Sequence, residues 1–188
     1  MLTGLLVAAC AALFLSRNYR VHAARARYAP LVHAQELVNA ERTDEALEVL
    51  DGIDTRKLDQ ELLLHWLGLR GYALALAGRG EEALDTLDDL ASLAEPEDRL
   101  SQLFLNGSRA IVAIADERFD DAEALLDSTE NACNDAPNRS EVWWWRAELA
   151  ARRGDDARRR HCLQEAAKLG EAYYATRARK ALQSVAAT

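Results

Sequence analysis

The feature that most restricts the fold of this chain is a repeat of 37 to 39 residues that begins after Pro30. In each copy a long apolar segment leads into a short polar turn, which is followed by a second apolar segment. One position of the first segment always holds a small residue: Ala34, Gly71, Ala110 and Ala147. A period of this length is typical of solenoids built from helical hairpins. Small residues at one helical position allow the two helices of a hairpin to approach closely.

The composition agrees with helices and argues against strands. The chain has 36 alanines and 30 leucines among 188 residues, whereas valine, isoleucine and threonine together number 18. Strands favour β-branched and aromatic residues, so the composition argues strongly against a β-sandwich or barrel. Three prolines and nine glycines leave little room for long loops. The sequence therefore predicts an all-α fold, with repeats over residues 31–188 and a capping helix over residues 171–185.

The N-terminal residues predict a membrane anchor. Residues 2–15 carry no charge, and a helix extended to Arg20 would be ~30 Å long, enough to cross the hydrocarbon core. Arg17 and Arg20 can reach the headgroups, and Tyr19 suits the interface. We therefore expect a transmembrane anchor over residues 1–20, contact with the bilayer through residues 2–20, and a basic juxtamembrane linker over residues 21–30.

The charges beside this segment predict its orientation. All nearby arginines follow the apolar run, and positive flanks stay cytoplasmic. This pattern favours a single-pass protein of a bacterial inner membrane with its soluble domain in the cytoplasm. Other interpretations stay open: a cleaved signal peptide, a lipoprotein attached through Cys10, a buried helix, or a true start upstream of Met1 that would reverse the orientation.

The second and fourth repeats resemble the tetratricopeptide repeat (TPR) family. Gly71, Gly78, Ala83 and Leu87 stand in the family register in the second repeat. The fourth repeat matches through Trp143, Ala147, Gly154, Leu163 and Ala166, while the first and third are degenerate and the spacing exceeds 34 residues. The resemblance implies a right-handed solenoid of about four TPR-like hairpins, followed by the capping helix.

The resemblance also implies where a partner would bind, because the first helices of TPR hairpins line a concave groove that receives polypeptides. Transferring the groove positions gives a partner-binding set of seven residues: His65, Tyr72, Phe104, Ile111, Trp144, Glu148 and Arg152. Three successive tryptophans, 143–145, cannot all share one buried stripe of a helix. In the family register Trp143 is core and Trp144 faces the groove, although a core role for Trp144 stays open.

No motif for catalysis, cofactor binding or metal binding is present. The four histidines lack metal-ligand spacing, and no phosphate-binding loop or hydrolase elbow occurs. Adjacent acidic residues stand at helix starts, where they favourably meet the helix dipole. With 31 acidic and 23 basic residues the chain is a poor ligand for nucleic acid. We expect no catalytic residue, no metal and no cofactor.

Charges alternate in sign along the chain. Residues 81–98 hold eight acidic and no basic residues, residues 116–135 hold eight acidic residues against Arg118, and residues 152–180 hold nine basic against four. A solvated surface is the ordinary meaning of such runs, and self-association stays open. The sequence thus favours a membrane-anchored adaptor for a membrane-associated protein partner. The alternatives are a periplasm-facing co-chaperone near the secretion machinery and a purely structural subunit of a larger complex.

Overall fold

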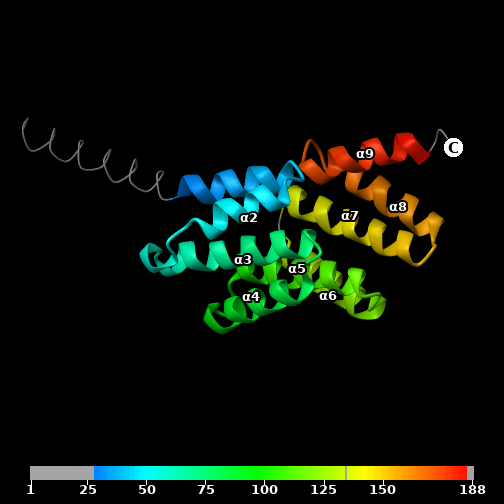
Figure 1. The fold of residues 1–188 in the computed structure, drawn as a ribbon. Helices are drawn as coiled ribbons and strands as arrows, with labels where there is room; N and C mark the ends of the chain where they lie inside the picture. The colour runs from blue at the N-terminus through cyan, green and yellow to red at the C-terminus, as the bar shows by residue number, and fades with distance from the viewer. Residues whose placement is uncertain (1–27, 134, 186–188) are drawn as a thin grey trace, which may run out of the picture.

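The computed structural model describes residues 28–133 and 135–185, and in this part of the chain the regular structure is helical with no strand (Figure 1). The all-α prediction is therefore confirmed. Residues 28–39 form the first helix, and the elements that follow are α2 (Thr43–Asp51), the short 3-10 helix η1 (Thr55–Lys57), α3 (Gln60–Leu76), α4 (Gly80–Leu93), α5 (Arg99–Ala115), α6 (Phe119–Ala132), α7 (Ala136–Arg152), α8 (Asp156–Ala167) and α9 (Tyr173–Val185).

The helices from residue 28 to Ala167 pair as consecutive hairpins that follow the predicted repeats. The same tight turn joins the two helices of each hairpin. After α3, the Gly78 N–H donates to the Ala75 carbonyl and the Arg79 N–H donates to the Leu74 carbonyl. These two bonds form a Schellman cap, which needs one residue with positive φ. That residue recurs along the described chain: Glu41 (φ 62°), Gly78 (74°), Glu117 (59°) and Gly154 (73°).

Two of these caps place a glutamate where glycine is the favoured residue, which explains why the first and third repeats look degenerate. A side chain with a Cβ in the left-handed region costs about 1–2 kcal/mol. Glu117 is exposed and forms no ion pair in the described structure, so its backbone can be tested alone. We expect Glu117→Gly to raise the free energy of unfolding by about 0.5–1 kcal/mol in urea denaturation, after the added freedom of glycine in the unfolded chain is subtracted.

Glu117→Ala is the matched control for this prediction. It removes the same charge but keeps a Cβ at positive φ, so it should not raise the stability. An equal gain in both variants would mean that the glutamate charge, and not the backbone conformation, is the source of the cost.

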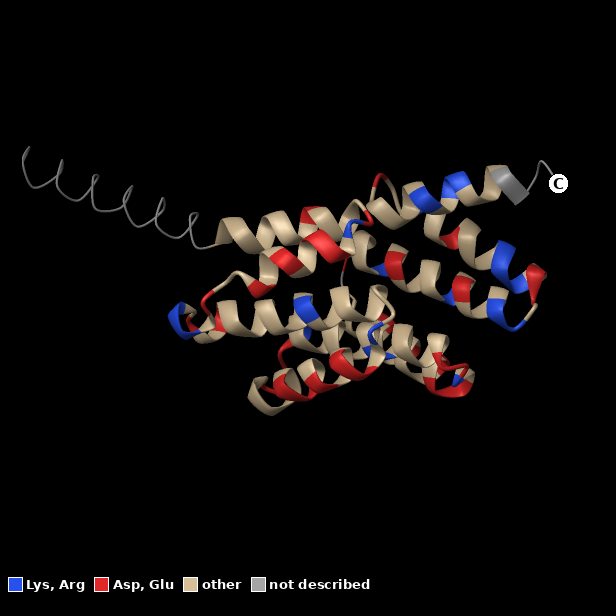
Figure 2. Cartoon of the chain, in the orientation of Figure 1, with Lys and Arg blue, Asp and Glu red and all other residues tan. Residues whose placement is uncertain are grey.

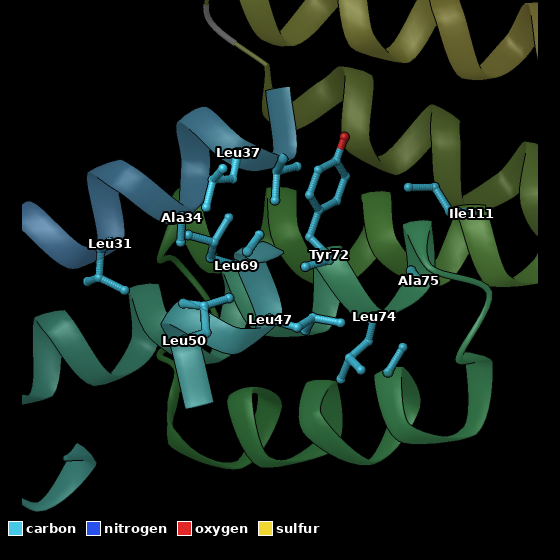
Figure 3. Packing of buried hydrophobic residues seen from close by; sticks show 14 of the residues in the cluster. Leu31, Ala34, Leu37, Leu47, Leu50, Leu69, Tyr72, Leu74, Ala75 and Ile111 are labelled. Atoms are coloured by element: carbon cyan, nitrogen blue, oxygen red, sulfur yellow. The ribbon is translucent and has the colours of Figure 1, made fainter. Parts of the chain in front are cut away.

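Close approach of helices depends on the small residues of the repeat. A Cβ built on Gly71 would lie 2.7 Å from Leu87 Cδ2 and 3.7 Å from the carbonyl oxygen of Ala83. Ala83 itself is fully buried. The close approach of the two helices that was predicted at Gly71 is therefore confirmed, and it occurs beside Ala83 and Leu87 of α4. The largest core cluster extends from this hairpin to the first one, where Leu31, Ala34 and Leu37 face leucines of α2 and α3 (Figure 3).

The alternating charges find partners within the chain. Acidic residues lie along α4 and α6, whereas basic residues gather on α8 and α9 (Figure 2). Arg146 of α7 is only 11% exposed and bonds both Asp127 and Glu130 of α6, each at 2.6 Å. Arg153 bonds Asp120 and Glu123, and Arg158 also pairs with Glu123. Much of the sign alternation therefore joins one hairpin to the next.

Helix α9 packs on α7 and α8, at the place where a capping helix was predicted. Tyr174 and Ala178 are buried in this contact, and Ala181 packs against the same cluster. The start of α9 also reaches the first hairpin, because the Tyr173 hydroxyl donates to Glu41 at 3.1 Å and Arg177 pairs with Glu41 at 3.2 Å. The start of α9 thus lies beside the turn of the first hairpin, although the two are separated by more than a hundred residues in the chain (Figure 1).

The predicted membrane anchor, residues 1–20, and its flank Arg17, Tyr19 and Arg20 lie outside the described residues. Among the residues that are described, no helix combines the length and the apolar character needed to cross a membrane. The predicted linker of residues 21–30 is described only from residue 28, where the chain is already helical and Tyr28 packs against the first core cluster.

Candidate functional site

The first helices of the successive hairpins face a common cavity of about 390 Å³, which we call the inner hollow. The helix over residues 28–39 and helices α3, α5 and α7 contribute most of its wall, with α6 and the start of α9 completing it. The residues that line it are Gln35, Asn39, His65, Tyr72, Leu100, Leu103, Phe104, Gly107, Leu126, Thr129, Cys133, Pro137, Asn138, Glu141, Val142, Trp145, Ala172, Tyr173 and Tyr174.

Three residues of the predicted groove line the inner hollow: His65, Tyr72 and Phe104. The rings of His65 and Phe104 are in contact, with centroids 5.9 Å apart. Ile111 does not line it and is instead buried in the largest core cluster. The groove residues predicted on α3 and at the start of α5 therefore line the hollow, whereas Ile111, further along α5, does not.

The other three predicted residues lie elsewhere. Trp144 and Glu148 line a second hollow of about 380 Å³, on the other side of Tyr173 and Tyr174, and Arg152 is exposed near the end of α7. We call this cavity the second hollow; it is lined by Val38, Glu41, Thr43, Leu76, Trp144, Trp145, Glu148, Tyr173, Tyr174 and Arg177. Tyr173 and Tyr174 at the start of α9, together with Trp145 of α7, line both cavities.

Helix α7 presents a different face to the inner hollow from the one that the family register predicts. Asn138, Glu141 and Trp145 line the hollow, and their spacing of three and four residues places them on one side of the helix. Glu141 and Trp145 were missed as site residues. Their spacing of four residues in the sequence could have indicated that they share one face of the helix. The run of three tryptophans made it unclear which tryptophan lies on that face.

The structure buries Trp144, in agreement with its core interpretation and against an exposed anchor. Trp144 is 8% exposed and packs in the cluster of α7, α8 and α9. Its ring centroid lies 6.2 Å from that of Tyr174, and the Arg177 guanidinium stacks 4.4 Å from it. Trp143 is half-buried, with its ring edge-on to His161.

Three polar aromatic groups meet where α3, α7 and α9 converge. The hydroxyls of Tyr72 and Tyr174 are hydrogen bonded to each other, although the residues are 102 positions apart. The Trp145 ring lies 6.4 Å from that of Tyr174 and packs against three core clusters. The indole N–H of Trp145 is buried and has no hydrogen-bond partner in the described structure. This junction forms the inner wall of the hollow.

Glu141 supplies the one carboxylate of the lining. Removal from water raises the pKa of its carboxyl, and interactions with the Tyr72 hydroxyl and the Trp145 indole oppose that rise. The contact between the Trp145 indole and the Glu141 carboxyl does not have the geometry of a hydrogen bond, because the indole N–H has no hydrogen-bond partner in the described structure. No arginine or lysine lines the cavity among the described residues, and Glu141 takes part in none of the ion pairs found there.

The remaining titratable groups of the lining give the site no positive charge and no nucleophile. Burial lowers the pKa of His65, partly offset by the nearby Glu61 charge, so its imidazole is neutral at neutral pH. Burial raises the pKa of the Cys133 thiol to about 11, which keeps it in the poorly reactive protonated form. In the described part of the chain, no three histidine, cysteine or acidic side chains gather in a metal-binding arrangement.

The raised pKa of Glu141 has a consequence for stability. The folded protein holds the Glu141 proton more tightly than the unfolded chain, so this group favours folding at low pH, and the benefit is lost as the pH rises through its folded pKa. Glutamine in its place cannot ionise. We therefore expect Glu141→Gln to raise the free energy of unfolding at pH 7, with the gain disappearing near pH 4 in urea titrations at both values.

Glu123 provides the opposite case as a control. Its hydrogen bond with Arg158, together with Arg153, lowers the pKa of its carboxyl, so its stabilisation is present at neutral pH and is lost as the pH falls through its folded pKa. Glu123→Gln should lower the stability at pH 7 and have less effect at acid pH. If both variants respond to pH in the same direction, the ionised Glu141 is not a cost to the fold.

No family model, curated protein or solved structure matches the chain.

Proposed function

We propose that this protein is a TPR-like, membrane-anchored adaptor that holds a segment of a partner polypeptide in the inner hollow, without catalysing a reaction on it. The observation that carries the proposal is that the first helices of consecutive hairpins contribute to one cavity. Helix-lined grooves of this kind receive extended or helical segments through apolar pockets and a few polar contacts. Assembly or regulation of a membrane-associated complex is the role that fits such an adaptor.

Two exposed leucines allow the groove to be tested against the ends of the hairpins. Leu100 is 48% exposed and lines the inner hollow, whereas Leu93, at the end of α4, is 46% exposed and lies outside it. Each is replaced by a photocrosslinking phenylalanine derivative in the full chain, expressed in its native membrane. We expect polypeptide adducts from position 100 and none from position 93.

The same pair of variants distinguishes the alternatives. Adducts at position 93 and not at position 100 would place the partner outside the groove, as expected of a purely structural subunit, and this result would contradict the adaptor proposal. Equal yields of polypeptide adducts at both positions would mean that proteins collide with the surface at random and do not bind at a specific site. A reaction with only lipid or detergent at position 100 would also count against polypeptide binding.

The orientation proposed for the anchor has its own test. Because the arginines follow the apolar segment, the soluble domain should lie in the cytoplasm. An alkaline phosphatase fused to the C-terminus should then be inactive and a fluorescent protein bright. An active phosphatase would instead support the periplasm-facing co-chaperone. Replacing Arg17 and Arg20 by glutamine should weaken the bias, whereas replacing Arg159 and Arg160, which lie far along the chain, should not.

A further inference from the structure

Glu141 differs from the two partly buried glutamates of α6, because each of those meets an arginine. Glu123 is 29% exposed and is met by Arg153 and Arg158, and Glu130 is 34% exposed and bonds Arg146. Glu141 is half-buried on the wall of a cavity and has no such partner among the described residues. A carboxylate that is partly removed from water without a positively charged partner is costly, and such a group on a cavity wall is a candidate for a functional role.

The side chains around Glu141 leave room and acceptors for a cation. Asn138 lies one turn earlier on the same face of α7, and its amide NH₂ already donates to Asp135 at 3.0 Å, so its carbonyl oxygen remains available as an acceptor. Tyr72, Tyr174 and Trp145 bring hydroxyl oxygens and ring faces to the same wall. Rings of this type attract a cation placed over them.

We propose that the inner hollow is a binding site for an ammonium group carried on an apolar stem, with the Glu141 carboxylate as its counter-ion. The ammonium donates to Glu141 and to the Asn138 carbonyl, and the stem lies against Phe104 and Leu103. A cavity of about 390 Å³ is within the range used by small ligands. Anions are disfavoured because the described lining offers no positive charge at neutral pH.

A lysine side chain of a bound polypeptide and a free organic amine present this same chemistry. In the first case the inference deepens the proposed function and rests on it. In the second case the ammonium site stands without any polypeptide partner. The experiment therefore needs one arm for the charge of the ligand and another for its source.

The charge arm uses three ligands with the same ring: 2-phenylethylamine, 2-phenylethanol and 3-phenylpropionate. The full chain is titrated with each at neutral pH by isothermal calorimetry. We expect the amine to bind about tenfold or more tightly than the alcohol, and the carboxylate to bind least. Equal affinities for amine and alcohol, or tightest binding of the carboxylate, would overturn the proposal. This comparison needs no variant.

A matched pair of variants then tests the counter-ion. Glu141→Gln should lower the amine affinity about tenfold and leave the alcohol affinity unchanged. Glu148→Gln, two turns further along α7 in the second hollow, should change neither. An equal loss in both variants would show that general negative charge attracts the amine and would overturn the role of Glu141. If Glu141→Gln does not fold, the three-ligand comparison on the unmodified protein still decides.

The source arm compares a short peptide containing lysine between leucines with the same peptide containing norleucine. Tighter binding of the lysine peptide supports both the ammonium site and polypeptide capture. Binding of phenylethylamine with no binding of either peptide keeps the ammonium site and removes support from the proposed function. Equal binding of the two peptides, with no preference for the amine over the alcohol, rejects the ammonium site and leaves a purely apolar groove.

Discussion

Trp144→Ala is expected to lower the free energy of unfolding by about 3–5 kcal/mol, the cost of removing a large buried ring. Trp144 is 8% exposed and packs with Cys162, Leu163 and Tyr174 between α7, α8 and α9. Its loss opens a cavity at the contact that holds α9 in place, and it also removes the ring on which Arg177 stacks. Urea denaturation followed by far-ultraviolet circular dichroism measures the change.

Trp143→Ala is the matched comparison, on the neighbouring residue of the same helix. Trp143 is half-buried, with His161 at its edge and the Arg146 guanidinium 4.8 Å from its ring centroid. Part of its surface is already in water, so its truncation should cost less than that of Trp144. A larger loss for Trp143→Ala would restore the register inferred from the TPR resemblance, in which Trp143 is the core residue.

Gly71→Ala should lower the free energy of unfolding by about 1–3 kcal/mol, although alanine is the better helix former. The added Cβ would come within 2.9 Å of Leu87 Cγ as well as close to Cδ2. Leu87 is fully buried and cannot move aside without displacing its neighbours in α4 and α5. Overpacking therefore outweighs the gain in helix propensity.

Gly107→Ala is the control, because it adds the same methyl group at a helical position of α5 that has space. The nearest atom to its built Cβ is Thr129 Cγ2, at 4.0 Å. We expect this variant to be more stable by about 0.5–1 kcal/mol, from helix propensity alone. Thermal and urea unfolding of both variants measure the difference. If Gly71→Ala is also stabilising, α3 and α4 do not approach each other as closely as the hairpin packing requires.

Local interactions explain why much of the fold could be predicted from the sequence. The period of 37 to 39 residues, the abundance of alanine and leucine, and the small residues at one position of each repeat act within a hairpin. Gly78 and Gly154 mark the turns because a positive φ is a local requirement. Even where glutamate replaces glycine, at positions 41 and 117, the repeat length alone locates the turn.

The predicted site was only partly correct because a groove depends on the rotation of each helix about its axis. On α3 the transferred positions His65 and Tyr72 do face the hollow. On α7 the face is turned, so Asn138, Glu141 and Trp145 line it, while Trp144 packs toward α9. A hydrophobic pattern cannot specify this rotation when three tryptophans in succession cover much of the helix circumference.

What the sequence determined by itself was the kind of element, the length of the repeat and the position of each turn, since these depend on propensity and on residues close together in the chain. Only the tertiary structure decided that α9 reaches back to Glu41 and Tyr72, and that Glu141 lies on the wall of a cavity with no counter-ion among the described residues. The contacts of α9 with Glu41 and Tyr72 join residues more than a hundred positions apart, and they exist only after the hairpins have packed together.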